Sequence, residues 1–331
     1  MRKEIINRFF ENIEKLHCLV IGDLMIDAYR LGKVKRISPE APVPVIEIES
    51  KEDRLGGAAN VAFNLKHLGA KTTLIGTVGK DEQGKLLKSL LTDNQMSTNG
   101  ILEVDSKRTT VKTRVIAQNQ HLLRMDEEDC SELSMEEQDN LYELLEQICT
   151  NEKVDVIIFE DYNKGLLNAE FIQKAIALAK QLNIPTTVDP KKANFTDFNG
   201  ATLFKPNKKE IIEGLKLDDE ISLNHLKNLT VDFANDSNFD LVLLTLSEDG
   251  VMISDKTDTF TDRAHKRDIT DVSGAGDTVI AVASLALALK LDKDLIATLA
   301  NLAGGLVCEK VGVVPIDKDL LHQEAIRLLI G

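Results

Sequence analysis

The sequence has no excess of positive charge. Its 331 residues include 54 Asp and Glu but only 40 Lys and Arg, which gives a formal net charge of −14 at pH 7. A strongly negative surface repels the phosphate backbone of nucleic acids, so this composition argues against nucleic acid as a partner. A small anionic substrate is still compatible with the sequence, provided that a few local cations converge on it.

Long apolar runs are also missing. The longest candidate, "TVIAVASLALAL" at 278–289, falls short of the roughly 20 residues that cross a bilayer and is typical of a buried helix in a globular domain. The N-terminal stretch "MRKEIINRFFENIEKL" is amphipathic and charged, so we expect no secretory signal. Together these features predict a cytoplasmic protein that has no membrane partner.

Cysteine and histidine are sparse and show no pattern of metal ligation. The four cysteines form no CxxC motif, and the six histidines form no i,i+3 or i,i+4 pair. Three of the cysteines lie in apolar or helical contexts, where a thiol behaves as a small hydrophobic group. The sequence therefore predicts no zinc site and favours a reducing compartment.

What the sequence does have is a repeated alternation of short apolar runs and amphipathic stretches. Apolar runs such as "LHCLVIGD" (16–23), "KTTLIGTVG" (71–79) and "VDVIIFEDY" (154–162) are typical of buried strands. Each is followed by a segment with helical periodicity. This order predicts an α/β fold in which a mostly parallel sheet is covered by helices on both faces.

Two segments break this alternation. Residues 41–55 and 109–126 alternate apolar and polar side chains, as half-exposed strands do. We expect a small β-sheet, with strands from about 30–55 and 101–126, that acts as a lid on a single domain spanning 1–331. An ordinary edge hairpin without motion is the alternative. Because its exposed apolar side chains need cover, we also expect a homodimer through this sheet.

The stretch "DVSGAGD" at 271–277 stands directly before an apolar helix. Backbone N–H groups at a helix start have no partner inside the helix, and small residues let an anion approach them. Asp277 falls in the first turn, where the helix dipole is expected to lower its pKa. Such a carboxylate can still orient a hydroxyl in phosphoryl transfer. The alternative is a simple turn followed by a helix start.

This stretch resembles the C-terminal signature of the ribokinase-like (PfkB) carbohydrate kinases, and "GGAANVAFNLKHLGA" at 56–70 is similar to their N-terminal glycine motif. The resemblance implies a three-layer α/β/α domain with a β lid, and an ATP- and Mg²⁺-dependent sugar kinase. It also implies site roles: Asp277 as catalytic base, Gly274, Ala275 and Gly276 as an anion hole, and Gly56, Gly57, Asn60 and Asp161 as sugar-binding residues.

A narrower resemblance concerns the segments 22–49, 114–126, 160–167 and 188–210. They are similar to kinases that phosphorylate the anomeric hydroxyl of heptose 7-phosphate in ADP-heptose synthesis for lipopolysaccharide. Those kinases are often fused to an adenylyltransferase with a His-x-Gly-His motif, which this sequence lacks. The resemblance therefore implies the kinase alone and a separate adenylyltransferase downstream. Another sugar or nucleoside kinase of the same fold is the alternative.

Further candidate residues would bind the sugar phosphate. Asp23 and Asp27 follow the first strand, at the end where open α/β sheets bind ligands; solvated loop carboxylates are the alternative. A substrate phosphate needs cations, and arginine pairs bind phosphate with two parallel hydrogen bonds. The candidate cations are Arg114, Arg124, Lys164 and Lys191, each of which could instead be an ordinary surface charge.

The nucleotide and its metal have candidates too. "NKKE" at 207–210 is similar to the family's Asn-x-x-Glu motif, so Asn207 and Glu210 are expected at Mg²⁺, with Glu210 acting through water. A capped helix start is the alternative. The resemblance adds nucleotide contacts at Thr245, Ser247, Gly250 and Asn301. Three departures from the family pattern concern Ser273, Glu160 and Leu246, where relatives more often have Thr, Ser and Arg.

Two other classes of protein fit the sequence less well. An NAD-dependent oxidoreductase needs Gly-x-Gly-x-x-Gly after its first strand, and the sequence there, "IGDLMID", has a single glycine. A non-catalytic sugar sensor on a kinase fold would not need the carboxylate at Asp277. The sequence therefore favours a sugar kinase over an oxidoreductase or a non-catalytic sugar sensor.

Overall fold

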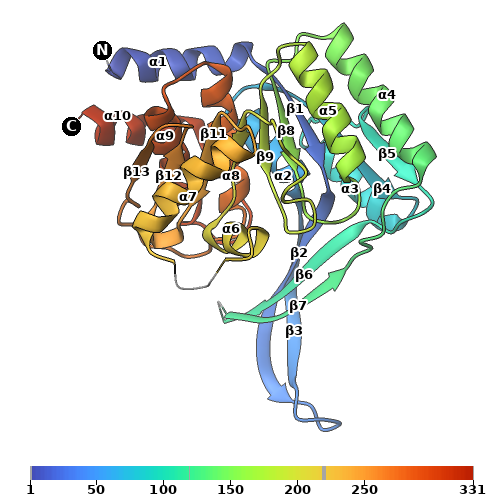
Figure 1. The fold of residues 1–331 in the computed structure, drawn as a ribbon. Helices are drawn as coiled ribbons and strands as arrows, with labels where there is room; N and C mark the ends of the chain where they lie inside the picture. The colour runs from blue at the N-terminus through green and yellow to red at the C-terminus, as the bar shows by residue number, and fades with distance from the viewer. Residues whose placement is uncertain (1, 119, 218–220, 331) are drawn as a thin grey trace.

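The computed structural model describes residues 2–118, 120–217 and 221–330. Its strands form two sheets (Figure 1). The larger has nine strands in the order β13-β12-β11-β10-β9-β8-β1-β4-β5, and the smaller has four in the order β3-β2-β6-β7. Helices cover the larger sheet on both faces, so the predicted α/β fold with a small second sheet is confirmed.

Neighbouring strands of the larger sheet are parallel from β11 to β5, whereas the pairings of β11 with β12 and of β12 with β13 are antiparallel. Its strands are β1 (His17–Gly22), β4 (Lys71–Gly79), β5 (Ile101–Val104), β8 (Val156–Glu160), β9 (Thr186–Asp189), β10 (Leu203–Phe204), β11 (Leu241–Thr245), β12 (Val251–Ser254) and β13 (Thr259–Asp262). The strands β1, β8 and β9 are buried along their whole length. Burial on both faces explains why these strands are continuous apolar runs in the sequence.

Two hydrophobic cores lie on opposite faces of this sheet. Successive residues of a strand point to opposite faces, and in β1 Val20 belongs to one core while Ile21 belongs to the other. Helices α1 (Arg2–Asn12), α2 (Ala58–His67), α3 (Glu82–Asp93), α8 (Ala275–Ala288), α9 (Lys293–Val307) and α10 (Lys318–Ile330) contribute to the first core. Helices α4 (Met135–Asn151), α5 (Ala169–Gln181), α6 (Lys208–Gly214) and α7 (Leu223–Asp236) contribute to the second. Two short 3₁₀ helices are η1 (Ile13–Lys15) and η2 (Ser247–Asp249).

The small sheet projects from the body as a long twisted ribbon (Figure 1). Its strands are β2 (Leu24–Ile37), β3 (Pro44–Gly57), β6 (Thr110–Ala117) and β7 (Gln120–Glu127). The expected boundaries need correction: the sheet begins at residue 24 rather than 30, and Ile101–Val104 is not part of it. That segment forms β5, which pairs with β4 at the edge of the larger sheet. The polar–apolar alternation that marks the small sheet starts only at Thr110.

The far half of the small sheet is exposed. Every residue of β7 is solvent-exposed, and large apolar side chains remain uncovered at Ile37, Val43, Ile48, Leu122, Leu123 and Met125. Among the described residues, no helix combines the length and the apolar character that a membrane crossing requires. Cys18, Cys149 and Cys308 are buried and Cys130 is exposed, all as free thiols.

The parallel strands end at one common edge of the larger sheet. β1, β8, β9 and β10 finish at Gly22, Glu160, Asp189 and Phe204. Asp23 links the end of β1 directly to the start of β2, so the small sheet joins the body at this edge. In open α/β sheets the carboxyl ends of the strands are where ligands bind.

Candidate active site

Helix α8 begins at this edge with its glycines accessible. Gly274 caps the helix with φ 78°, a left-handed conformation that favours glycine. Gly274, Ala275 and Gly276 are partly exposed, whereas Asp277 is only 5% exposed. The N–H of Ala275 donates to the backbone oxygen of Val272 at 3.3 Å. The start of the helix is nevertheless partly exposed, so an anion could approach its backbone beside a buried carboxylate.

The two glycine motifs of the sequence meet at Asp277. Asn60 in α2 donates a hydrogen bond from Nδ2 to Asp277 Oδ2 at 2.6 Å, across 217 positions of the chain. Tyr162 donates from its hydroxyl to Asp277 Oδ1 at 2.9 Å. Sequence reasoning missed Tyr162, although it lies in "EDYNKGLL", directly after a buried strand. Both oxygens of the carboxylate are thus held in a fixed orientation.

Positions 56 and 57 require glycine because atoms of neighbouring residues lie too close to leave room for a Cβ atom. A Cβ atom on Gly56 would lie 2.4 Å from Asp27 Oδ2, and a Cβ on Gly57 would lie 2.5 Å from the backbone oxygen of Asp23. Gly57 also has φ 57° and stands at the cap of α2. These glycines let β3 and the start of α2 pack against both aspartates.

The surroundings of Asp277 raise its pKa, although its place at a helix start predicted a lower one. Burial raises the pKa of Asp277 to about 6, and the negative charge of Asp189 adds to the effect against the hydrogen bonds from Asn60 and Tyr162. The expected lowering by the helix start is therefore wrong. Loss of hydration and a neighbouring carboxylate outweigh the partial charges of the helix terminus. A carboxylate with this pKa is ionised at neutral pH and suited to accept a proton.

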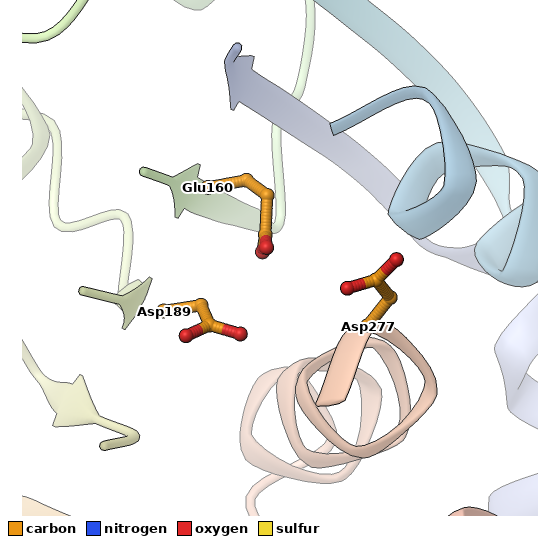
Figure 2. A group of neighbouring side chains, drawn as sticks. All are labelled: Glu160, Asp189 and Asp277. Carbon is orange, nitrogen blue, oxygen red and sulfur yellow. The ribbon is translucent and has the colours of Figure 1, made fainter. Parts of the chain in front are cut away.

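Asp277 belongs to a cluster of three buried carboxylates (Figure 2). Glu160 is the last residue of β8 and Asp189 is the last residue of β9. One carboxylate oxygen from each of the three residues lies within 4.8 Å of one from each of the other two. Burial, and then the charges of Asp189 and Asp277, raise the pKa of Glu160 well above its usual range. Sequence reasoning did not place Glu160 or Asp189 in the site, although both end strands at the ligand-binding edge.

Two lysines flank this cluster. Lys205 Nζ lies 2.9 Å from Asp189 Oδ2 and is almost fully buried, and Lys191 Nζ lies 3.2 Å from Asp189 Oδ1. Burial alone would raise the pKa of Asp189, but these two charges outweigh it and lower the pKa. A Cβ on Gly276 would lie 3.7 Å from Lys205 Nζ. An anion at the start of α8 would therefore lie close to a buried ammonium group that the sequence analysis did not single out.

Asn207 and Glu210 form the capping box that the sequence left as an alternative. Asn207 Oδ1 accepts a hydrogen bond from the N–H of Glu210 at 2.9 Å, and Glu210 Oε2 accepts one from the N–H of Asn207 at 2.8 Å. Glu210 Oε1 forms an ion pair with Lys191 at 2.7 Å. Glu210 is thus joined to the carboxylate cluster through the lysine while it caps α6.

Asp23 and Asp161 organise the loop that follows β8. Asp23 accepts backbone hydrogen bonds from Tyr162 and Lys164, at 2.8 and 3.0 Å, and Asp161 accepts one from Asn163 at 2.8 Å. Burial raises the pKa of Asp161 to about 6, and the charge of Asp23 contributes. Their carboxylates thus hold the backbone of this loop, from which the Tyr162 side chain reaches Asp277.

Lys164 lies apart from Asp277. Its Nζ forms an ion pair with Glu128 Oε2 at 2.8 Å and lies 3.6 Å from Cys130 Sγ. Among the candidate cations, the structure therefore brings Lys191 to the carboxylate cluster and ties Lys164 to the segment that follows β7.

Arg114 and Arg124 lie directly opposite each other on β6 and β7. Side chains opposite each other on antiparallel strands point to the same face of the sheet. Arg114 forms an ion pair with Asp27, which lies beside Gly56, whereas Arg124 is 60% exposed and hydrogen-bonds Asp126 at 2.9 Å. The small sheet thus presents two guanidinium groups on one face: that of Arg114 is half-buried near the glycine motif, and that of Arg124 is exposed and paired with Asp126.

The candidate nucleotide contacts lie around the end of β11. Thr245 is paired with Asn207 in an isolated bridge, and Ser247 and Gly250 adopt positive φ values of 54° and 93° in the turn that follows. Asn301 in α9 donates from Nδ2 to Asp262 Oδ2 at 2.8 Å, so its amide fixes the end of β13. Leu246 is buried in the core.

Comparisons with known proteins show which sequences this chain is similar to. Residues 15–319 match the family described as pfkB family carbohydrate kinase. The chain is 40% identical over 309 residues to the bifunctional protein HldE of Methylobacillus flagellatus, covering 92% of this chain and 62% of that protein. It is 40% identical over 313 residues to HldE of Campylobacter jejuni subsp. doylei, covering 94% and 65%. The chain thus spans less than two thirds of the length of these relatives.

Solved structures share the fold. Phosphofructokinase-2 from Escherichia coli, in complex with potassium, superposes with a TM-score of 0.79 at 18% identity, covering 96% of this chain and 99% of that one. Arabidopsis thaliana ribokinase, complexed with ribose and ATP, has a TM-score of 0.72 at 15% identity, with coverage of 95% and 99%. At such low identity these likenesses show the arrangement of sheets and helices.

Proposed function

Since this chain belongs to the pfkB family of carbohydrate kinases, we propose that it transfers the γ-phosphoryl group of ATP to the anomeric hydroxyl of a heptose 7-phosphate, with D-glycero-D-manno-heptose 7-phosphate as the substrate. The product would be the heptose 1,7-bisphosphate, a precursor in ADP-heptose synthesis for lipopolysaccharide. Phosphoryl transfer to a sugar follows from the family, and the choice of sugar is our proposal. It is supported by the similarity of residues 22–49, 114–126, 160–167 and 188–210 to heptose 7-phosphate kinases.

The hydrogen bond between Asn60 and Asp277 is the observation that carries this proposal. It joins Asn60 of the N-terminal glycine motif to Asp277 at the start of α8, which supports a site where the proposed sugar-binding and anion-binding motifs share one carboxylate. A sugar hydroxyl held over Asn60 would therefore lie between the base and a phosphoryl group at Gly274–Gly276. Neither motif alone would bring the two reactants together.

The proposed reaction uses Asp277 as the base. The anomeric hydroxyl oxygen attacks the γ-phosphorus, its proton passes to Asp277, and the bond between the γ-phosphorus and the bridging oxygen breaks to release ADP. The N–H groups of Gly274–Gly276 stabilise the charge that develops on the phosphoryl oxygens. Lys205 lies close enough to this helix start to add a second positive group.

Arg114 and Arg124 would bind the 7-phosphate of the sugar. They share one face of the lid and lie at the side of Asp27 and Gly56, where the sugar is expected. Arg114 is already paired with Asp27, so we assign it to orienting the sugar end of the substrate. Arg124 is exposed and would exchange its surface ion pair with Asp126 for the phosphate. A guanidinium group offers the paired donors that a phosphate accepts.

ATP would bind along the end of β11, with Thr245, Ser247, Gly250 and Asn301 on the adenine side. Such a kinase needs a divalent cation, which we propose to be Mg²⁺, and which when bound neutralises charge on the phosphates. The oxygens of Asn207 and Glu210 already accept backbone hydrogen bonds, and Glu210 also pairs with Lys191. This arrangement fits a contact of Glu210 through water rather than direct ligation.

The cellular setting is part of the proposal. We place the reaction in the cytoplasm, where ATP is available, and expect a separate adenylyltransferase to act on a later intermediate. We also propose a homodimer through the lid. The exposed apolar side chains of β7, such as Leu122 and Leu123, support a contact with a second copy.

A substrate panel tests the proposed function. ADP release is coupled to an optical assay with ribose, fructose, fructose 6-phosphate, adenosine and heptose 7-phosphate, and the product is located by NMR. We expect the highest kcat/KM with heptose 7-phosphate and a new phosphate on the anomeric oxygen. A preference for a neutral sugar or a nucleoside would reject the proposed substrate and favour another kinase of the same family.

A further inference from the structure

Glu160 is buried without a partner. It is 0% exposed, and neither of its carboxylate oxygens has a hydrogen-bond partner among the described residues. Its side chain points toward Asp189 and Asp277 (Figure 2). A buried polar group left unpaired is costly, so a native structure normally supplies it with a proton, a water or an ion.

The charges around Glu160 do not balance. Four carboxylates meet here, those of Glu160, Asp189, Asp277 and Glu210, and within the described part of the chain two ammonium groups, Lys191 and Lys205, form ion pairs with them. Lys191 is shared between Asp189 and Glu210, and Lys205 serves Asp189 alone. When all groups are ionised the site carries two excess negative charges. These charges face the end of α8 that the phosphates of ATP approach, so an uncompensated cluster would repel the nucleotide.

We propose that Glu160 and Asp189 are direct ligands of a divalent cation of the Mg²⁺ type. One carboxylate oxygen from each residue of the cluster lies within 4.8 Å of one from each of the other two. An ion with oxygen ligands at about 2.1 Å holds opposite ligands about 4.2 Å apart, so the cluster is close to the required size. Such hard cations prefer carboxylate oxygens and keep several waters. A bound dication would balance the two excess charges.

The assignment within the cluster follows from the hydrogen bonds. Both oxygens of Asp277 already accept bonds from Asn60 and Tyr162, which leaves Asp277 as the base. Both oxygens of Glu160 are free, so Glu160 is the anchoring ligand. Asp189 contributes an oxygen and is held in place by Lys205 and Lys191. The catalytic role of the ion, though not its binding, rests on the proposed kinase function.

Direct metal binding without nucleotide tests the assignment. Mn²⁺ is titrated into the full chain at mildly alkaline pH, without ATP or sugar, and free Mn²⁺ is followed by EPR together with calorimetry. We expect one site per chain, weakened about tenfold or more in Glu160→Gln and in Asp189→Asn. Glu160→Asp, which keeps the carboxylate, should bind more tightly than Glu160→Gln.

Two controls separate this site from other effects. Glu170→Gln changes an exposed glutamate of α5 that pairs with Lys174 and should leave Mn²⁺ binding unchanged. Glu210→Gln should reduce it less than Glu160→Gln does, because Glu210 is not a direct ligand. Thermal unfolding confirms that each variant folds. The assignment is overturned if the wild-type chain binds no Mn²⁺ at millimolar concentration, or if Glu160→Gln binds as the wild type does. Neither result would change the outcome of the substrate panel, which tests the proposed function independently of metal binding.

Discussion

The edge of the larger sheet and the small sheet beside it are built in opposite ways. At the edge, Asp277, Glu160 and Lys205 are buried; Asp277 is held by hydrogen bonds and Lys205 by an ion pair with Asp189. On the small sheet, β7 is exposed throughout and Arg124 has most of its side chain in water. In the proposed function, the groups that would carry the reaction are thus preorganised in the body, whereas the proposed sugar-phosphate contacts lie on an exposed surface that a ligand or a second copy would complete.

Replacing the base should have the largest effect. Asp277→Asn keeps the shape of the side chain but cannot accept the hydroxyl proton, so we expect kcat to fall about 10³-fold. Steady-state ADP release measures this, and ATP binding by calorimetry should stay close to wild type. Activity near the wild-type level would mean that another group is the base and that the body is not preorganised around Asp277.

Removing a buried cation should affect stability next. Lys205→Met leaves Asp189 with fewer positive neighbours in a buried site, so we expect a loss of about 3–5 kcal/mol in the free energy of unfolding in metal-free buffer. Urea denaturation measures it. The matched control is Lys192→Met, an exposed lysine 3.8 Å from Glu213, which should cost less than about 0.5 kcal/mol. Equal losses in the two variants would contradict the contrast between buried and exposed charges.

The pH dependence should report the buried carboxylate. Because the pKa of Asp277 is raised to about 6, kcat/KM should fall about tenfold per pH unit as the pH drops below that value and the base becomes protonated. The phosphate of the substrate titrates nearby, at about 6. Tyr162→Phe separates the two, since loss of its hydrogen bond should move the acid limb to higher pH. If the acid limb of the kcat/KM profile stays at the same pH in Tyr162→Phe, that limb reports the substrate phosphate rather than Asp277.

A change on the lid should be smaller and selective. Arg124→Ala should raise KM for the sugar phosphate about tenfold through loss of a charge-assisted hydrogen bond, with kcat nearly unchanged. Arg36→Ala, at another exposed arginine of the same sheet, is the control and should leave KM unchanged. A fall in kcat rather than a rise in KM would show that the lid takes part in chemistry as well as binding.

The smallest effect on catalysis is expected from the outer face of the lid. Leu123→Glu places a charge among exposed apolar side chains, so we expect a dimer to dissociate while the free energy of unfolding of the single chain changes by less than about 0.5 kcal/mol. Light scattering after size exclusion measures the mass. A wild-type monomer would remove the proposed dimer without affecting the site in the body.

The sequence predicted some parts of the site better than others. Asp277, Gly274–Gly276, Gly57 and Asn60 could be placed because short motifs with glycine at fixed positions imply their own local geometry. Glu160 carried a signal too, since it departs from the family pattern, but nothing local said that its side chain turns inward. Nothing in the local sequence indicated that Lys205 is buried, because a lysine that follows an apolar run is commonly a surface residue.

The boundaries of the lid show a similar limit. Alternation of polar and apolar residues marked both half-exposed segments, but β2 begins earlier because its first residues are buried and read as apolar. Ile101–Val104 joined the larger sheet because a short apolar strand fits either sheet, and only pairing with β4 decides between them.

Local patterns in the chain were enough to determine the class of fold, the parallel sheet and the two glycine motifs, because each depends on the periodicity or conformational freedom of neighbouring residues. Tertiary structure alone decided that Glu160, Asp189, Lys205 and Tyr162 surround Asp277, and that burial raises its pKa. Desolvation and Coulomb interaction act through space between groups that lie far apart in the chain, so no window of sequence contains them.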